Sequence, residues 1–70
     1  MIGLFLGEKQ LPFEILKKIK KKNIKYFIID LTKNNRFRND KNSFYISIGK
    51  FGKILNLIHS KKCNRVLFAG

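Results

Sequence analysis

The hydrophobic residues of this chain occur in two patterns, short runs and longer stretches with helical spacing. Nearly unbroken apolar runs occur at residues 2–6, 25–29 and 65–68. Runs of this length are typical of strands in a parallel sheet that is covered on both faces. Residues 44–48 alternate apolar and polar side chains instead, which predicts a short strand with one more exposed face.

Two segments between these runs have the spacing of amphipathic helices. Residues 11–22 include Pro12, which suits the first helical position, and residues 49–60 have the more regular period. The predicted buried stripes consist of Leu11, Ile15, Leu16 and Ile19 in the first helix and of Phe51, Ile54, Leu55 and Ile58 in the second. The resulting order, β-α-β-β-α-β, predicts an α/β fold with a mostly parallel sheet.

The turn between the first strand and the first helix is the first candidate site. Gly7 ends the apolar run, and three polar residues, Glu8, Lys9 and Gln10, lead to Leu11. Open α/β sheets bind ligands at turns of this kind, beyond the carboxyl ends of their strands. If Pro12 is the first helical residue, Leu11 is the N-cap and offers no side-chain acceptor, so the first helical amides are left for water or an anion.

A second turn of the same kind precedes the second helix. Gly49, Lys50 and Gly52 place two glycines and a lysine at the start of that helix. Their backbone amides could hold a phosphate or a sugar. The two glycines could equally serve close helix packing, and the spacing leaves both interpretations open.

Several established kinds of site are missing. The dinucleotide pattern G-x-G-x-x-G does not follow the first strand, so we interpret Asp30 as an ordinary acid at the end of the second strand. The phosphate-loop pattern is also absent. A single histidine, His59, and a single cysteine, Cys63, leave little for metal or nucleophilic chemistry. Among the four acidic residues, only Glu8 falls in the predicted cleft.

The net charge of +12, from sixteen basic and four acidic residues, indicates an anionic partner or a compositional excess of lysine at solvated positions. The best local candidate for nucleic-acid contact is Arg36-Phe37-Arg38, in a polar loop at residues 31–43 that is predicted to be flexible or to carry a short turn. No apolar run approaches the ~20 residues of a membrane span. The N-terminus lacks the pattern of a signal peptide.

Three motifs in order resemble a known family. They are Gly7 followed by Leu11-Pro12, the segment Ile48-Gly49-Lys50-Phe51-Gly52-Lys53, and the closing strand Val66-Leu67-Phe68-Ala69-Gly70. Together they resemble the N-terminal domain of the UDP-2,3-diacylglucosamine pyrophosphatase family of Gram-negative lipid A biosynthesis. The resemblance covers essentially the whole chain and implies a Rossmann-like domain.

The resemblance implies a hydrolase that cleaves UDP-2,3-diacylglucosamine to 2,3-diacylglucosamine 1-phosphate (lipid X) and UMP. It implies a metal, expected to be Mg²⁺, and a cytoplasmic enzyme with peripheral contact at the inner membrane. The essential acid belongs to a C-terminal catalytic domain, so residues 1–70 are expected to be a truncated N-terminal domain, inactive alone and without a catalytic or metal-binding residue. Substrate contacts are expected at Gly7, Glu8, Lys9, Gln10, Leu11, Pro12, Gly49, Lys50, Gly52 and Gly70.

One residue departs from the family pattern. The family usually has a second glycine in the first turn, where this chain has Lys9. Lys9 either reflects the excess of lysine or supplies a charge to a phosphate. The resemblance favours a lipid substrate over nucleic acid, and the alternative function is a small basic binding module, without catalysis, for nucleic acid or another anionic partner. The sequence leaves the oligomeric state open.

Overall fold

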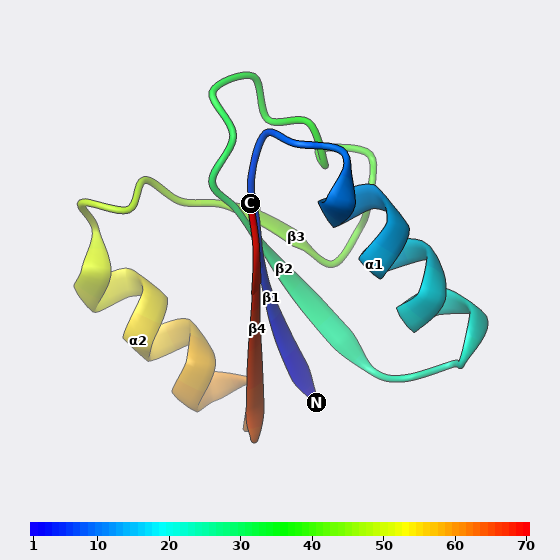
Figure 1. The fold of residues 1–70 in the computed structure, drawn as a ribbon. Coiled ribbons are helices and arrows are strands. Elements are labelled where there is room, and N and C mark those ends of the chain that lie inside the picture. Colours follow the sequence, from blue (N-terminus) through cyan, green and yellow to red (C-terminus); the bar gives the residue numbers. More distant parts are fainter.

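The computed structural model describes residues 1–70 and contains four strands and two helices (Figure 1). The elements are β1 (Ile2–Leu6), α1 (Leu11–Lys21), β2 (Tyr26–Asp30), β3 (Ser43–Tyr45), α2 (Phe51–Ser60) and β4 (Arg65–Ala69). The predicted order β-α-β-β-α-β and the α/β class are therefore confirmed. Neither helix has the length and apolar composition needed to cross a membrane.

The four strands form one sheet in the order β3-β2-β1-β4, and every neighbouring pair is parallel. From β1 the chain moves outward through β2 to β3, and then crosses back to add β4 on the other side of β1. Right-handed crossovers in opposite directions place their helices on opposite faces, and Figure 1 shows α1 and α2 on the two sides of the sheet. The sheet is Rossmann-like, and its strands all end at one carboxyl edge.

The α1 face contains the larger part of the core. Its buried residues are Ile2, Leu4, Leu6, Leu16, Ile19, Ile28, Phe37 and Ala69. Phe37 belongs to the loop between β2 and β3, and its ring lies 5.0 Å from that of Phe13 on α1. The loop therefore covers part of the α1 face, where a parallel crossover usually supplies a helix.

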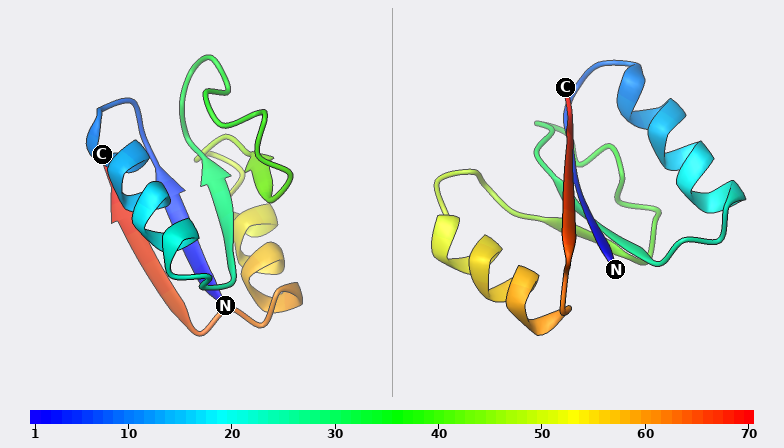
Figure 2. Two further views of the ribbon diagram at one scale, coloured as in Figure 1. Left: turned by 90° about the vertical axis from the view of Figure 1, so that its right-hand side faces the viewer. Right: turned by 60° about the horizontal axis from the view of Figure 1, so that its bottom comes forward.

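The α2 face has a smaller core made by Phe5, Phe27, Ile29 and Ile54. In the left view of Figure 2, α1 crosses in front of β1 and β4, whereas α2 lies behind the other half of the sheet. The outer strand β4 is consequently less covered on the α2 face. Phe68 stacks on Phe5 at 4.5 Å but remains 70% exposed.

The third strand is shorter than predicted. It ends at Tyr45, whereas the alternating pattern predicted a strand through Ile48. The reason is its partner: β3 pairs only with β2, and the last pair joins Asp30 to Tyr45, so residues beyond Tyr45 have no strand beside them. By contrast, β2 and β4 each extend one residue past the predicted end, to Asp30 and Ala69.

The second helix begins at Phe51 rather than at the predicted Gly49. Before it, the amide of Lys50 donates to the Ser47 carbonyl at 2.9 Å, and the amide of Gly49 donates to the Ser47 hydroxyl at 3.3 Å. These bonds form a turn, and the backbone of Lys50 is not helical. The first helix begins at Leu11 as predicted and ends one residue early, at Lys21.

Both predicted apolar stripes are partly wrong. Leu11 is 54% exposed, Phe51 60% and Leu55 43%, although the periodicity placed all three in the core. On α1 the buried residues are Pro12, Leu16 and Ile19. On α2 they are Ile54 together with the half-buried Leu57 and Ile58. The apolar stripe of each helix is wider than the part of the helix that packs on the small sheet. One edge of each stripe therefore faces solvent.

Candidate functional site

The order of the strands places a switch point between β1 and β4. The chain leaves β1 toward β2 on one side, and β4 is added on the other side. In open α/β sheets, ligands bind beyond the carboxyl ends of the strands where this reversal occurs. The first predicted turn, which follows β1, and Gly70, which follows β4, lie at this place (Figure 1).

The two strand ends approach closely through Gly7 and Gly70. The amide of Gly7 donates to the Ala69 carbonyl at 2.8 Å, and the amide of Lys9 donates to the Gly70 carbonyl at 2.9 Å. A Cβ atom built on Gly7 would lie 2.9 Å from the Gly70 carbonyl oxygen. A side chain at residue 7 would therefore force the backbone to move, and this contact explains why a glycine follows the first strand.

The loop that follows β2 holds the first turn from the other side. Nη1 of Arg36 donates to the carbonyls of Gly7 and Lys9, at 3.1 Å in each case. The carboxylate of Glu8 accepts a hydrogen bond from the amide of Lys33 at 2.9 Å. The guanidinium carbon of Arg36 lies 4.3 Å from the centre of the Phe13 ring. The first turn and this loop therefore form one connected unit.

The start of α1 has no side-chain cap, as predicted, but the N-cap is Gln10 rather than Leu11. The amide of Phe13 is not free, because it donates to the Gln10 carbonyl at 3.1 Å. The amides of Glu8, Gln10 and Leu11 have no acceptor in the protein. Free amides at a helix start, at the positive end of the helix dipole, favour an anion.

Asp30 is a structural acid, as the missing dinucleotide pattern predicted. It is fully buried at the end of β2. Its Oδ1 accepts hydrogen bonds from the amide and hydroxyl of Thr32, at 2.8 and 2.6 Å, and its Oδ2 accepts one from the amide of Phe37 at 3.0 Å. Asp30 therefore shapes the loop that braces the first turn, and it is not available to a ribose.

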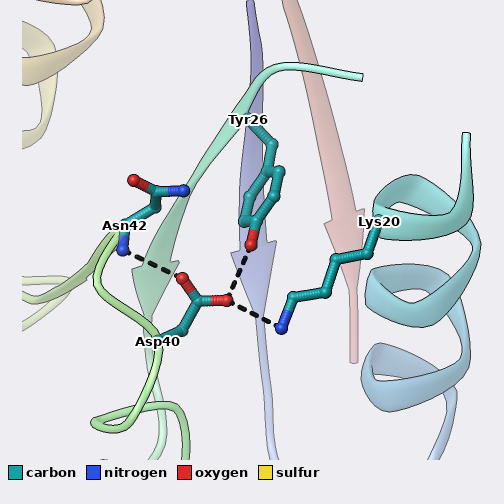
Figure 3. A network of polar contacts seen from close by, with 4 residues as sticks. All are labelled: Lys20, Tyr26, Asp40 and Asn42. Atoms are coloured by element: carbon teal, nitrogen blue, oxygen red, sulfur yellow. Dashed lines mark hydrogen bonds and ion pairs between the residues drawn. The ribbon is translucent and has the colours of Figure 1, made fainter. Parts of the chain in front are cut away.

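A second network fixes the far part of the same loop (Figure 3). Asp40 accepts hydrogen bonds from the Tyr26 hydroxyl at 2.8 Å and the Asn42 amide at 2.9 Å, and the Lys20 ammonium lies 3.2 Å from its Oδ2. Burial raises the pKa of Asp40, but these bonds and the lysine charge outweigh it and hold the pKa below its usual value. Burial and the bond to Asp40 raise the pKa of Tyr26.

The second predicted turn is not joined to the first. Gly49, Lys50 and Gly52 are exposed beside the start of α2, on the opposite face of the sheet (Figure 1). The structure thus brings Gly7 and Gly70 together with the first turn and leaves this second group apart. Pro12, another predicted contact, is a buried residue of α1 rather than one open to a ligand.

An open groove that the sequence did not reveal lies at the ends of β2 and β3. It has a volume of about 480 Å³ and is lined by Asp30, Leu31, Thr32, Lys33, Tyr45, Ile46, Ser47 and Ile48. The Tyr45 hydroxyl donates to the Lys33 carbonyl across it, at 2.6 Å. The alternation of Phe44, Ile46 and Ile48 was the available signal, but it was interpreted as a continuing strand.

The loop candidate for nucleic-acid contact is wrong in one respect. Phe37 is only 3% exposed, because its ring belongs to the core of the α1 face. A base needs an exposed ring on which to stack. The segment Arg36-Phe37-Arg38 therefore does not present an aromatic surface, and Arg36 is occupied by the first turn.

The acidic residues of this chain do not fit a magnesium site. No three of the histidine, cysteine, aspartate and glutamate side chains lie together. Asp30 and Asp40 are engaged in the bonds described above, and Glu8 binds the Lys33 amide. Mg²⁺ requires oxygen ligands in near-octahedral geometry, usually one or two carboxylates with water and phosphate.

Comparison with known proteins gives one match. A family model described as the LpxI N-terminal domain matches residues 1–70. Searches of curated proteins and of solved structures give no match. The family match covers the strand-turn-helix unit, the second turn and the closing strand that the sequence singled out. This chain belongs to the LpxI N-terminal domain family, and LpxI proteins are enzymes of lipid A biosynthesis.

Proposed function

We propose that this chain is the substrate-binding domain of a hydrolase that converts UDP-2,3-diacylglucosamine to 2,3-diacylglucosamine 1-phosphate and UMP. Family membership supports a role in lipid A biosynthesis. The observation that carries the site assignment is the contact of Gly7 with Gly70 at the switch point. There, two glycine backbones and the uncapped start of α1 meet at one edge of the sheet.

In this proposal the phosphate of the lipid sugar binds against the first turn. Glu8, Lys9 and Gln10 are exposed, and the turn offers the free amides of Glu8, Gln10 and Leu11 as donors. Lys9 replaces a glycine of the family pattern and supplies a positive charge where the glycine would supply only backbone. Gly70 forms the other side of the site.

Gly49, Lys50 and Gly52 serve in this proposal as a separate contact for a more distant part of the substrate. UDP-2,3-diacylglucosamine is long, since it joins a nucleotide, a pyrophosphate, a sugar and two acyl chains. The groove at the ends of β2 and β3 includes Ser47 and Ile48, which directly precede these residues, and Lys33, whose amide binds Glu8 of the first turn.

The chemistry itself is not assigned to residues 1–70. The family resemblance implies Mg²⁺, which would supply charge stabilisation to the pyrophosphate, but the acids of this chain do not fit such a site. What these residues contribute in the proposal is binding and orientation of the sugar phosphate. The metal and the essential acid are proposed to come from outside them.

The net charge of +12 supports approach to a membrane surface. Anionic head groups attract basic surfaces, with about 1 kcal/mol per lysine or arginine near the bilayer. The substrate is anionic and carries acyl chains, so we propose that the domain works in peripheral contact with the inner membrane, on its cytoplasmic side.

The reaction is tested with the enzyme that carries this domain. Purified protein is incubated with UDP-2,3-diacylglucosamine and Mg²⁺, and the products are separated by mass spectrometry. Equal amounts of UMP and 2,3-diacylglucosamine 1-phosphate are expected, and the 70-residue chain alone is expected to bind the product without hydrolysing the substrate. Absence of both products, together with salt-sensitive binding of random single-stranded DNA, would instead favour a basic binding module.

A further inference from the structure

Arg36 is a half-buried residue and has no acidic partner. The only ion pair in the structure joins Lys20 to Asp40. Nη1 of Arg36 instead donates to two carbonyls of one turn, those of Gly7 and Lys9. Arg36 therefore binds the backbone of the first turn and no carboxylate.

The two carbonyls determine where two amides point. In a trans peptide the C=O and N–H bonds lie in one plane and point in opposite directions, and the chain has no cis peptide bond. Since the Gly7 carbonyl faces Arg36, the N–H of Glu8 faces away from it. The same relation links the Lys9 carbonyl to the N–H of Gln10.

Both of these amides are without an acceptor in the protein. Glu8 and Gln10 are exposed residues, and their N–H groups point away from Arg36. The amide of Lys9 between them is different, because it donates to the Gly70 carbonyl and holds the turn against β4. The turn therefore directs two free N–H donors away from Arg36. Its other backbone groups, the amide of Lys9 and the carbonyls of Gly7 and Lys9, are held by hydrogen bonds.

Arg36 is itself fixed from behind. Its amide donates to the Thr32 hydroxyl at 2.9 Å, and that hydroxyl donates to the buried carboxylate of Asp30. Its guanidinium lies over the Phe13 ring at 4.3 Å and near the Phe37 ring at 5.9 Å. The amide of Arg36 is thus held by Thr32 and its guanidinium packs on the Phe13 ring, and both contacts favour one orientation of the two peptide groups that Arg36 binds.

We propose that Arg36 is a positioning residue that sets the peptide planes 7–8 and 9–10, so that the amides of Glu8 and Gln10 face a bound phosphate. It acts through the turn and not by touching the ligand. The identity of the ligand rests on the proposed function, whereas the orientation of the amides does not. Donors fixed in advance bind an anion without the cost of ordering the turn.

The first arm of the test needs no ligand. Residual dipolar couplings of ¹⁵N-labelled protein report the direction of each N–H bond, and they are compared for the unchanged chain, Arg36→Gln and Arg36→Lys. Arg38→Gln is the matched control, since Arg38 lies in the same loop and makes only 3.4 Å contacts with neighbouring carbonyls. We expect the couplings of Glu8 and Gln10 to change in Arg36→Gln, while those of β1 and of the control remain as they were.

The second arm measures binding of glucosamine 1-phosphate by the same proteins. Arg36→Gln is expected to weaken binding about tenfold, the loss typical of one hydrogen bond to a charged group. Arg38→Gln removes the same charge and is expected to change affinity less than about twofold. Arg36→Lys keeps the charge without the planar group, and we expect it to recover only part of the affinity.

Each outcome bears on the proposal. If Arg36→Gln weakens binding while the Glu8 and Gln10 couplings stay unchanged, Arg36 contacts the ligand directly and the positioning role is wrong. If neither the affinity nor the couplings change, the positioning role is also wrong. If the unchanged chain does not bind glucosamine 1-phosphate, the proposed site fails, and the couplings alone still decide whether Arg36 orients the turn. Should Arg36→Gln not fold, Arg36→Lys carries both arms.

Discussion

The two glycine-containing turns of this chain look alike in sequence and differ in structure. The first turn, Gly7 to Leu11, is bonded to the end of β4 and to the loop after β2. The second turn, Gly49 to Gly52, is exposed, and its bonds are local ones to Ser47 and within the start of α2. Glycine and lysine at a helix start therefore do not define a site by themselves. Position relative to the sheet decides which turn is held by other parts of the chain.

The largest contrast is expected between the phenylalanines associated with the two turns. Phe37 anchors the loop that braces the first turn and is 3% exposed, whereas Phe51 follows the second turn and is 60% exposed. Phe37→Ala is expected to lower the free energy of unfolding by about 3 kcal/mol or more. Phe51→Ala is expected to change it by less than about 0.5 kcal/mol. Urea unfolding followed by circular dichroism measures both, and equal losses would contradict the contrast.

The glycines themselves are expected to respond in opposite directions. Alanine at residue 7 places a Cβ 2.9 Å from the Gly70 carbonyl oxygen, whereas nothing lies within 4 Å of a Cβ at Gly52. Gly7→Ala is expected to cost about 1–3 kcal/mol of unfolding free energy, as overpacking does. Gly52→Ala is expected to stabilise α2 by about 0.5–1 kcal/mol, because glycine in a helix is unfavourable. The same unfolding measurement decides, and a stabilising Gly7→Ala would show that the close approach is absent.

The smallest effect concerns the network around Asp40. Because the folded pKa of Asp40 is lowered, its contribution to stability is present above the unfolded pKa of about 3.9 and is lost as the pH falls through the folded value. Lowering the pH from 5 to 3 should therefore destabilise the unchanged chain more than Asp40→Asn, by less than about 1 kcal/mol. Melting temperatures across this range test it, with Glu14→Gln as the exposed control. If the pH dependence is the same in Asp40→Asn, the network around Asp40 does not contribute to the loss of stability at low pH.

The fold was predictable because local pattern and global arrangement agree. The unbroken apolar run of residues 2–6 indicated a strand covered on both faces, and β1 is one of the two inner strands and has a core on each side. The turn at Gly7 was predictable for a similar reason. Only a few residues separate the end of the first strand from the start of the first helix, so the turn has few other places to lie. The end of β3 was not predictable, because it depends on the length of its neighbour β2.

The candidate site was only half predictable. Gly7 and Gly70 lie at opposite ends of the sequence, and the family resemblance, not the spacing, connected them. The sequence showed that Arg36 is charged but not what it binds. Its partners are two backbone carbonyls, which every residue has, so no side-chain pattern could identify them. Phe37 was interpreted as an exposed aromatic residue because it lies in a polar loop. Its place in the core follows from the absence of a helix between β2 and β3, which leaves the loop to cover the sheet.

In the proposed function the first turn, and not its counterpart before α2, receives the phosphate. Titration of the ¹⁵N-labelled chain with 2,3-diacylglucosamine 1-phosphate in detergent micelles, followed by amide chemical shifts, tests it most directly. Empty micelles are the control for contacts made by the detergent. We expect the largest shifts at the amides of Glu8, Gln10 and Leu11, with smaller ones at residues 49–53. Shifts concentrated at residues 49–53, with the first turn unchanged, would contradict it.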